Sequence, residues 1–367
     1  MAHIETFGHG GDLRTASAAF GVPEDQLLDF SANINPLGPP PDLMKRLVQD
    51  MGRLVHYPDP AHRGLIKGLA KKYGVSERML AVGNGAAECM ALVLLALAPR
   101  TVGVIYPSFV EYTQLARQFG ARVVSCTGRA EDGFLPTLPE LHMLIKQVDL
   151  VFIGHPNNPT GLMYDVQILR KLAAWADEFG TYVVIDEAFL DFLPESQQPT
   201  LIGELGRYPR VILIRSMTKF YAIPGLRLGF AVAAPALIRK LKGKQVPWSV
   251  NALALAAGEV CCEQNEYETA TRLLVDTERA YLIGRIREWF GWRVWPGKAN
   301  FLLIRLHKEM TADTMQLALG KRGIMIRSCA MYPGLTPHDI RIAVRLREEN
   351  DRLLEAFGAV LVEGGQL

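Results

Sequence analysis

Short, continuous apolar runs recur between residues 102 and 232, and they constrain the fold of this chain more than any other feature. The clearest are Val102–Ile105, Leu150–Ile153, Tyr182–Ile185, Val211–Ile214 and Gly229–Val232. Unbroken apolarity, rather than alternation, is typical of strands that are covered on both faces. Helix-like stretches such as Gln167–Glu178 lie between the runs. The pattern predicts an α/β fold with a mostly parallel central sheet and helices on both faces.

The pattern changes after roughly residue 250. A long helical region at about 251–290 leads into the strand-like segments Asn300–Arg305 and Asp339–Arg345, which together indicate a smaller α+β unit. The first forty residues are rich in Gly, Pro and Asn and predict an arm rather than a domain. We therefore expect an arm at 1–40 that contributes to the active site and the small domain, a large domain at 41–250 and a small C-terminal domain at 251–367.

The segment Arg215–Phe230 carries the most informative polar residues. It follows a buried run and places four groups in one turn-rich loop: Ser216, Thr218, Lys219 and Arg227. A lysine at the end of a core strand can form an imine with an aldehyde cofactor, and hydroxyl groups beside a guanidinium suit a phosphate. Pyridoxal 5'-phosphate (PLP) requires this set of groups. A surface lysine in a polar loop is the alternative interpretation.

Two turn-rich segments precede that loop. In Val82–Glu88, glycines stand ahead of an apolar helix, where backbone N–H groups can meet a phosphate. A dinucleotide fingerprint is not met because Glu88 replaces the third glycine, and a plain helix N-cap is the alternative. His155–Gly161 follows a strand end; its side-chain amides could bond a cofactor ring oxygen, or the segment could be only a tight connection.

Asp186 ends the apolar run Tyr182–Ile185. A carboxylate there is costly without a partner. A protonated pyridine nitrogen would be such a partner and would stay electron-withdrawing, whereas a buried salt bridge to an arginine is the alternative. The glycine segment, the turn, the aspartate and the lysine each follow an apolar run, and open α/β sheets bind ligands at the carboxyl ends of their strands.

In this order the motifs resemble those of a known family. Gly-x-Gly-x-x-Glu, Pro-Asn-Asn-Pro-Thr-Gly, Asp-Glu-Ala-Phe, Ser-x-Thr-Lys and Gly-Leu-Arg-Leu-Gly are similar to the motifs of fold-type I PLP enzymes in the histidinol-phosphate aminotransferase branch. The resemblance implies that Lys219 binds PLP covalently, that Asp186 pairs with the pyridine nitrogen and that Phe109 stacks on the ring. It also implies that Asn158 contacts the ring oxygen. The cofactor phosphate would be bound by Gly85, Ala86, Ser216, Thr218 and Arg227. The resemblance further implies a homodimer, in which Tyr57 reaches the cofactor phosphate of the other subunit.

The two ends of the chain resemble a subgroup of that family, the O-phospho-L-threonine decarboxylases of cobalamin biosynthesis. The similar segments include Gly8–Asp12, Leu28–Pro39, Val246–Asn251 and Ile326–Leu335. The likeness implies substrate contacts from six residues: His9, Gly10, Asn33, Asn158, Arg327 and Arg341. Two arginines and a histidine suit a substrate with both a phosphate and a carboxylate. A mobile tail residue is the alternative for His9, and an exposed strand charge is the alternative for Arg341.

Two positions depart from the family pattern. Phe189 stands where many aminotransferases of this branch have a tyrosine whose hydroxyl bonds the cofactor ring oxygen. The change removes a hydrogen-bond donor and weakens the aminotransferase interpretation. Ala86 stands where the decarboxylase pattern has a polar residue, but only its backbone N–H needs to face a phosphate.

Composition excludes several functional classes. The net charge is +2 without a basic block, so neither nucleic acid nor an anionic membrane is an expected partner. The longest apolar stretch, Met90–Ala98, is too short to span a bilayer, and the N-terminus lacks an apolar signal core, so we expect a cytoplasmic protein. Five cysteines without a Cys-x-x-Cys spacing indicate reduced thiols and no metal site.

Three rival functions remain. A histidinol-phosphate-type aminotransferase would use the same scaffold and cofactor. A serine acyl hydrolase is suggested by Ser216-x-x-Lys219 and Ser249-x-Asn251, although no Lys-Thr-Gly is present. A non-catalytic binding protein of this fold is the third, and it fits poorly with Lys219, Asp186 and Arg227 all in place.

Overall fold

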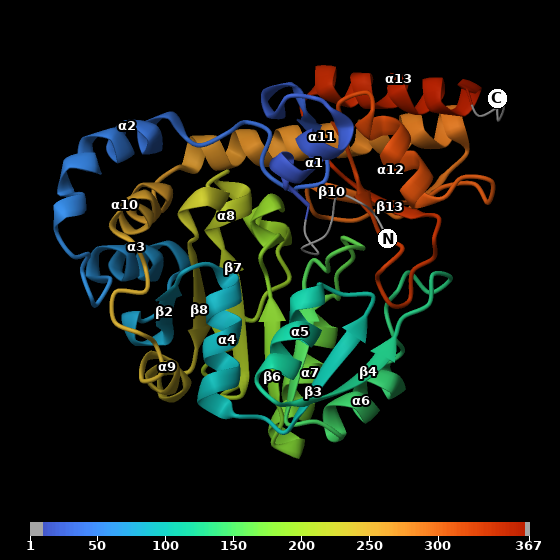
Figure 1. The fold of residues 1–367 in the computed structure, drawn as a ribbon. Helices are drawn as coiled ribbons and strands as arrows, with labels where there is room; N and C mark the ends of the chain where they lie inside the picture. The colour runs from blue at the N-terminus through green and yellow to red at the C-terminus, as the bar shows by residue number, and fades with distance from the viewer. Residues whose placement is uncertain (1–9, 364–367) are drawn as a thin grey trace.

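The fold is that of a computed structural model that describes residues 10–363 (Figure 1). Its largest sheet has the strand order β2-β8-β7-β6-β5-β3-β4. Strands β3, β4, β5, β6 and β7 run parallel to one another, whereas β8 is antiparallel to both β2 and β7. The bounds are β2 Leu80–Gly83, β3 Thr101–Tyr106, β4 Arg122–Thr127, β5 Leu150–Gly154, β6 Tyr182–Asp186, β7 Val211–Ser216 and β8 Gly229–Ala233.

Helices cover both faces of this sheet, which confirms the predicted fold class. On β6, Val183 and Ile185 pack into one core cluster and Val184 packs into the other. The first cluster contains residues of α3, α6, α7 and α10, and the second contains residues of α4, α5 and α9. The bounds are α3 Arg63–Tyr73, α4 Ala86–Leu97, α5 Val110–Gln118, α6 Leu138–Lys146, α7 Val166–Phe179, α8 Met217–Phe220, α9 Pro235–Lys242 and α10 Ala252–Cys261.

A second, antiparallel sheet has the order β12-β13-β10-β9. Figure 1 shows it below α13, with α11 crossing above the large sheet toward the same region. The predicted helical region at 251–290 is two helices, α10 and α11, because residues 262–264 leave the helical conformation. The bounds are β9 Arg293–Val294, β10 Phe301–Arg305, β12 Arg327–Ser328, β13 Asp339–Ala343, α11 Asn265–Phe290, α12 Ala312–Gly320 and α13 Arg347–Glu363.

The N-terminal segment is attached to the second sheet and to α8. Strand β1 (Leu28–Asp29) pairs in parallel with β11 (Ile324–Met325), and Phe30 accepts a backbone hydrogen bond from Ala343 of β13. Asn35 donates its side-chain amide to the carbonyl of Phe220 in α8, at 2.7 Å. The helices of this part are α1 Leu13–Phe20 and α2 Pro41–Asp50. Within the described residues, no helix is both long and apolar enough to cross a membrane.

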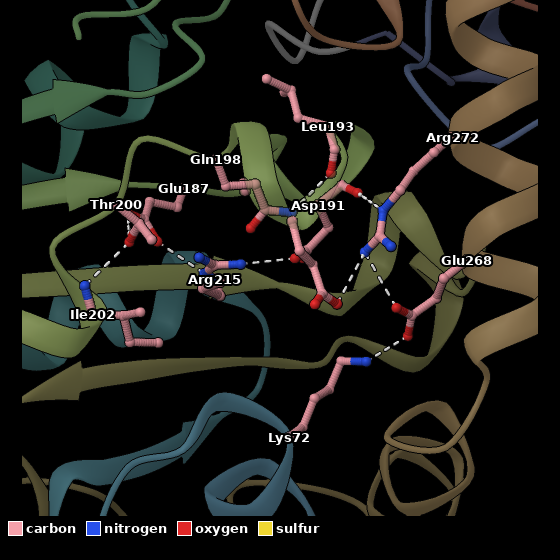
Figure 2. A network of polar contacts seen from close by, with 12 residues as sticks. Lys72, Glu187, Asp191, Leu193, Gln198, Thr200, Ile202, Arg215, Glu268 and Arg272 are labelled. Carbon is pink, nitrogen blue, oxygen red and sulfur yellow. Dashed lines mark hydrogen bonds and ion pairs between the residues drawn. The ribbon is translucent and has the colours of Figure 1, made fainter. Parts of the chain in front are cut away.

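A buried ion network joins the large sheet to α11 (Figure 2). Arg215 of β7 donates to Glu187 at 2.8 Å and to Asp191 at 2.7 Å, and its side chain is 1% exposed. Arg272 of α11 reaches the carbonyl of Asp191 at 3.0 Å. A second branch pairs Arg272 with Glu268, which binds Lys72 of α3. The network fixes the loop after β6, and therefore the strand end that carries Asp186.

Replacing Arg215 by Leu tests this network. The change leaves Glu187 and Asp191 in a dry interior without their cation, and we expect the free energy of unfolding to fall by about 3–5 kcal/mol at neutral pH. Because burial already raises the pKa of Glu187, the deficit should shrink as the pH falls and the carboxyl takes up a proton. Chemical denaturation at several pH values measures both effects.

Arg170→Leu is the matched control, because it breaks an Arg–Glu pair with Glu204 at 2.7 Å on the surface. It should cost less than about 1 kcal/mol. Equal losses in the two variants would contradict a structural role for the buried network.

Candidate active site

A cavity of about 380 Å³ opens at the carboxyl ends of the central strands. Strands β5, β6 and β7 are neighbours and parallel, so the polar residues that follow them gather at one edge of the sheet. Most of the residues that the sequence singled out line this cavity: Gly10, Asn33, Ala86, Phe109, Asn158, Asp186, Ser216, Thr218, Lys219, Arg227, Arg327 and Arg341.

Lys219 lies in α8, directly after β7, in surroundings that favour its neutral form. Burial lowers the pKa of its amine to about 8, and the positive charges of Arg341 and Arg227 act in the same direction. The lysine is therefore far more often neutral near pH 8 than an exposed lysine is. A neutral amine is the form that attacks a carbonyl carbon, so the position suits covalent capture of an aldehyde.

Asp186 is a buried carboxyl at the end of β6. Burial raises its pKa to about 6, although two hydrogen bonds oppose the shift. The hydroxyl of Tyr112 donates to Oδ2 at 2.7 Å, and the backbone N–H of Ala188 donates to Oδ1 at 3.0 Å. A buried carboxyl held in this way gains most from a cationic partner, such as a protonated ring nitrogen.

The opposite end of the cavity offers a place for a phosphate. Ala86 begins α4, where backbone N–H groups point outward. Gly85 precedes it with φ of 87°, and a Cβ there would lie 2.8 Å from the guanidinium of Arg227, so only glycine fits. Ser216 and Thr218 share a hydrogen bond of 2.6 Å between their hydroxyl groups on the neighbouring strand end.

Arg341 reaches the cavity from the small sheet. Its guanidinium donates to the side-chain oxygen of Asn158 at 2.6 Å and to the carbonyl of Ser31 at 2.6 Å. Because the oxygen of the Asn158 amide accepts this bond, its nitrogen is left as a donor, which suits a ring oxygen. The alternative interpretation of Arg341, an exposed strand charge, is wrong, since the residue is 5% exposed.

Arg327 and Asn33 complete the same end of the cavity. Arg327 on β12 lies directly opposite Arg341 in the strand register, and its side chain is 1% exposed. The side-chain oxygen of Asn33 is buried without a hydrogen-bond partner among the described residues. A buried polar atom of this kind is costly unless a ligand satisfies it. Two guanidinium groups beside an open acceptor can bind a molecule with anionic groups and a hydrogen-bond donor.

Two of the predicted residues that the structure describes do not line the cavity. Tyr57 is 80% exposed and stacks on Trp248, with ring centroids 4.7 Å apart. Gly85 is the N-cap residue of α4 and supports Arg227 rather than facing the open space. His9 lies outside the described residues.

Two further cavity residues were not among the predicted set. Glu111 and Tyr112 lie in the first turn of α5, just after Phe109, and both line the cavity. Burial raises the pKa of Glu111 to about 7. Their only sequence signal is the placement of a carboxylate and a phenol directly after a predicted ring-stacking aromatic, which alone does not show which way α5 turns them.

The chain is similar to well-characterised enzymes over nearly its full length. Residues 25–357 match the family described as aminotransferase class I and II. The chain is 38% identical over 354 residues to the threonine-phosphate decarboxylase of Salmonella typhimurium, and the match covers 96% of each protein.

Solved structures agree with this match. The histidinol-phosphate aminotransferase from Clostridium acetobutylicum superposes with a TM-score of 0.85 at 31% identity, covering 91% of this chain and 99% of that one. The histidinol-phosphate aminotransferase from Sinorhizobium meliloti, solved in complex with pyridoxal 5'-phosphate, has a TM-score of 0.80 at 24% identity and covers 90% of both chains.

The cofactor of this site is PLP, and the residues present fit it. The cavity has a buried carboxyl for a ring nitrogen, a lysine amine with a lowered pKa for an aldehyde and a helix N-terminus with an arginine for a phosphate. Phe109 also lines it, and its flat ring can lie against a planar heterocycle.

Replacing Tyr112 by Phe tests how Asp186 is held. The hydrogen bond from Tyr112 lowers the pKa of Asp186, so its loss should move that pKa up from about 6. The ionised carboxylate is then scarcer in mildly acidic solution, and we expect the dissociation constant for PLP to rise about 10-fold or more there. Titration of the cofactor-free protein with PLP at several pH values, followed by visible absorbance, measures the effect.

Tyr106→Phe is the control for this variant, because Tyr106 also loses one hydroxyl hydrogen bond, to Thr113, but lies outside the cavity. Equal PLP affinities for both variants at every pH would refute the positioning role of Tyr112.

Proposed function

The chain belongs to the aminotransferase class I and II family, and from this premise we propose that it is a PLP-dependent carboxy-lyase. Its substrate is O-phospho-L-threonine, and its product is (R)-1-amino-2-propanol phosphate, an intermediate of cobalamin biosynthesis. The observation that carries the proposal is the pair of buried arginines, Arg327 and Arg341, that face one cavity with Lys219. The similarity to the Salmonella typhimurium threonine-phosphate decarboxylase supports it.

The cavity matches the charges of this substrate. A phosphomonoester and a carboxylate are two separate anions, and a guanidinium binds either of them through two parallel hydrogen bonds. Arg341 is already oriented by Asn158 and Ser31, and Arg327 comes from the next strand. Asn33 offers its buried side-chain oxygen to a donor group of the substrate. His9 and Gly10 belong to the same proposal from the N-terminal segment.

PLP supplies an electron sink that weakens the bond at Cα held perpendicular to its ring. The residues of the chain decide which bond that is. Asp186 keeps the ring nitrogen protonated, and the side-chain nitrogen of Asn158 donates toward the ring oxygen. Arg327 and Arg341 would hold the anionic ends of the substrate and so orient its carboxylate, and Asn33 would accept a hydrogen bond from a donor group of the substrate. Lys219 Nζ would hold the aldehyde of the cofactor until the substrate amine takes its place, and would then be available to carry a proton.

A histidinol-phosphate-type aminotransferase is the second candidate, favoured by the likeness to the Clostridium acetobutylicum enzyme. It requires removal of the Cα proton instead of the carboxylate. Phe189 favours decarboxylation, because it brings no hydroxyl to the cavity and packs edge-on against Phe301, with ring centroids 5.0 Å apart. The acyl hydrolase interpretation has less support, since the hydroxyl of Ser216 is engaged with Thr218 at 2.6 Å.

The function is tested by incubating the PLP-loaded protein with O-phospho-L-threonine. We expect release of carbon dioxide and of an amine phosphate in equal amounts, measured by gas analysis and by phosphorus NMR. Lys219→Ala should lower the rate by about 10³-fold or more, since it loses both covalent capture and proton transfer. Lys240→Ala, an exposed change on α9, should match the original protein. Amino transfer from histidinol phosphate to a 2-oxo acid, without carbon dioxide, would decide for the second candidate.

We further propose that two copies of the chain form a homodimer through α2 and the segment after it. Large apolar side chains are exposed on this face: Val48, Met51, Leu54, Val55, Tyr57 and Trp248. A patch of this kind on a folded protein usually marks an interface. A second copy is the occupant that gives Tyr57 a role, because its phenol would then reach the cofactor phosphate of the other subunit. The proposal also includes the domain organisation, with an arm at 1–40, a large domain at 41–250 and a small domain at 251–367. It places the protein in the cytoplasm.

A charge placed on this face should separate the copies. Val55 is 82% exposed, so Val55→Asp leaves the fold intact but places a carboxylate in the interface. We expect a monomer with weakened PLP binding in sedimentation and titration experiments. Tyr57→Phe is the matched variant; it should remain dimeric while its dissociation constant for PLP rises about 10-fold through one lost hydrogen bond to a phosphate. A Val55→Asp protein that is dimeric and binds PLP normally would rule out this interface.

A further inference from the structure

Glu111 is a carboxyl group in the cavity for which the proposed function has no role yet. It lies in the first turn of α5 and lines the cavity together with Lys219 and Arg327. Its Oε2 atom is buried. The N-terminal end of a helix favours a negative charge, yet burial dominates and raises the pKa of this carboxyl to about 7. Glu111 can therefore carry a proton near neutral pH.

The charged groups around Glu111 act in both directions. Lys219 from α8 and Arg327 from β12 lower its pKa, whereas Asp186 from the end of β6 raises it. Glu111 in turn raises the pKa of Lys219, so each group shifts the pKa of the other. Elements packed against α5 carry further titratable or charged groups, which do not line the cavity: Glu88 on α4, Tyr106 on β3, and Arg122 and Cys126 on β4.

The substrate shifts this balance toward the protonated form. A phosphate and a carboxylate bring negative charge into the cavity and engage Arg327, whose charge stabilises an ionised Glu111. Two like charges that share a site cannot both stay ionised cheaply, and the weaker acid takes up a proton. With substrate bound, Glu111 therefore holds a proton beside Lys219 and the reacting part of the substrate.

Decarboxylation needs such a proton. When the bond from Cα to the carboxylate breaks, its electron pair stays on Cα and carbon dioxide leaves. A new C–H bond then requires one proton that the substrate does not contain, because its carboxylate was ionised. Amino transfer has no such requirement, since the proton removed from Cα remains available in the site. A decarboxylase on this scaffold therefore needs an acid that the aminotransferase reaction does not.

We propose that Glu111 is this acid, an inference that rests on the proposed decarboxylation. Its carboxyl O–H gives the proton that forms the new C–H bond, either to Cα directly or through the amine of Lys219. Glu111 becomes a carboxylate in that step and regains a proton from solvent before the next turnover. Because Glu111 donates to the reacting atoms, it is a catalytic residue of this reaction.

The decisive variant is Glu111→Gln, which keeps the shape of the side chain but has no acidic proton. We expect kcat for carbon dioxide release to fall about 10²-fold with KM little changed. In the original protein kcat/KM should decline as the pH rises past about 7, and kcat should decline at higher pH because bound substrate raises the pKa of Glu111; both declines should be absent in the variant. The amount of amine phosphate per carbon dioxide should also fall below one in the variant, because without this acid part of the decarboxylated substrate is not protonated at Cα and does not leave as the amine.

Two companion variants separate chemistry from structure. Glu111→Asp keeps an acid with a lower ordinary pKa, so it should restore part of kcat and shift the decline to lower pH. Glu140→Gln makes the same chemical change in the first turn of α6, where the carboxylate only caps its helix, and should leave kcat and the product ratio unchanged. PLP binding by each variant shows that the site is folded.

An infrared titration gives a reading that does not depend on activity. In cofactor-free protein, the difference spectrum between the original chain and Glu111→Gln should contain a protonated-carboxyl band that fades with a midpoint near pH 7. A carboxyl that is fully ionised at about pH 5 would overturn the proposal.

The kinetic results distinguish failure of the proposed function from failure of the proposed role of Glu111. If the original protein releases no carbon dioxide from O-phospho-L-threonine, the proposed function fails and the role of Glu111 falls with it. If it does, and Glu111→Gln keeps the same pH profile and product ratio, only the role of Glu111 is refuted. Should Glu111→Gln not bind PLP, the pH profile of Glu111→Asp decides in the same way.

Discussion

The guanidinium of Arg341 joins three of the segments of chain that line the cavity. It comes from β13 of the small sheet and donates to Asn158 after β5 of the large sheet and to Ser31 of the N-terminal segment. A buried guanidinium is costly unless its donors are paired, so these contacts hold the segments in a fixed relation. The same charge lowers the pKa of Lys219. One side chain therefore sets both the shape of the site and the protonation of its nucleophile.

Burial brings three different groups of this site toward neutral pH. It lowers the pKa of Lys219 to about 8 and raises those of Asp186 and Glu111 to about 6 and about 7. In water the pKa of the amine would lie many units above those of the two carboxyls. Here the three pKa values are close, so the groups can exchange protons at little cost. Such convergence of titration is typical of sites that move protons during a reaction. The buried ion network of Arg215 differs, because Glu187 and Asp191 are both paired with the guanidinium of Arg215.

The sequence predicts the central strands and their polar ends, because a strand buried on both faces must be apolar until it leaves the core. Lys219 and Asp186 could be found in this way. The edge strands β2 and β4 were not predicted; β2 is only four residues long, and β4 alternates between exposed and partly buried positions. Glu111 and Tyr112 were missed for another reason: the way α5 turns them into the cavity depends on contacts with distant residues, such as those of Tyr112 with Phe152 and Asp186.

The choice of reaction depends on contacts that arise only when distant segments meet. Asp186, Lys219 and the start of α4 serve any PLP enzyme of this fold, since they hold the cofactor and not the substrate. In the proposed function, Arg327, Arg341 and Asn33, which come from the ends of the chain, would contact the substrate and so select the bond that breaks. Selecting the bond does not complete the reaction, because a proton must also be delivered to the right carbon. An acid within the cavity does so only if it keeps its proton among several cations. Burial of Glu111 in the first turn of α5 meets that condition, because desolvation there outweighs the nearby positive charges.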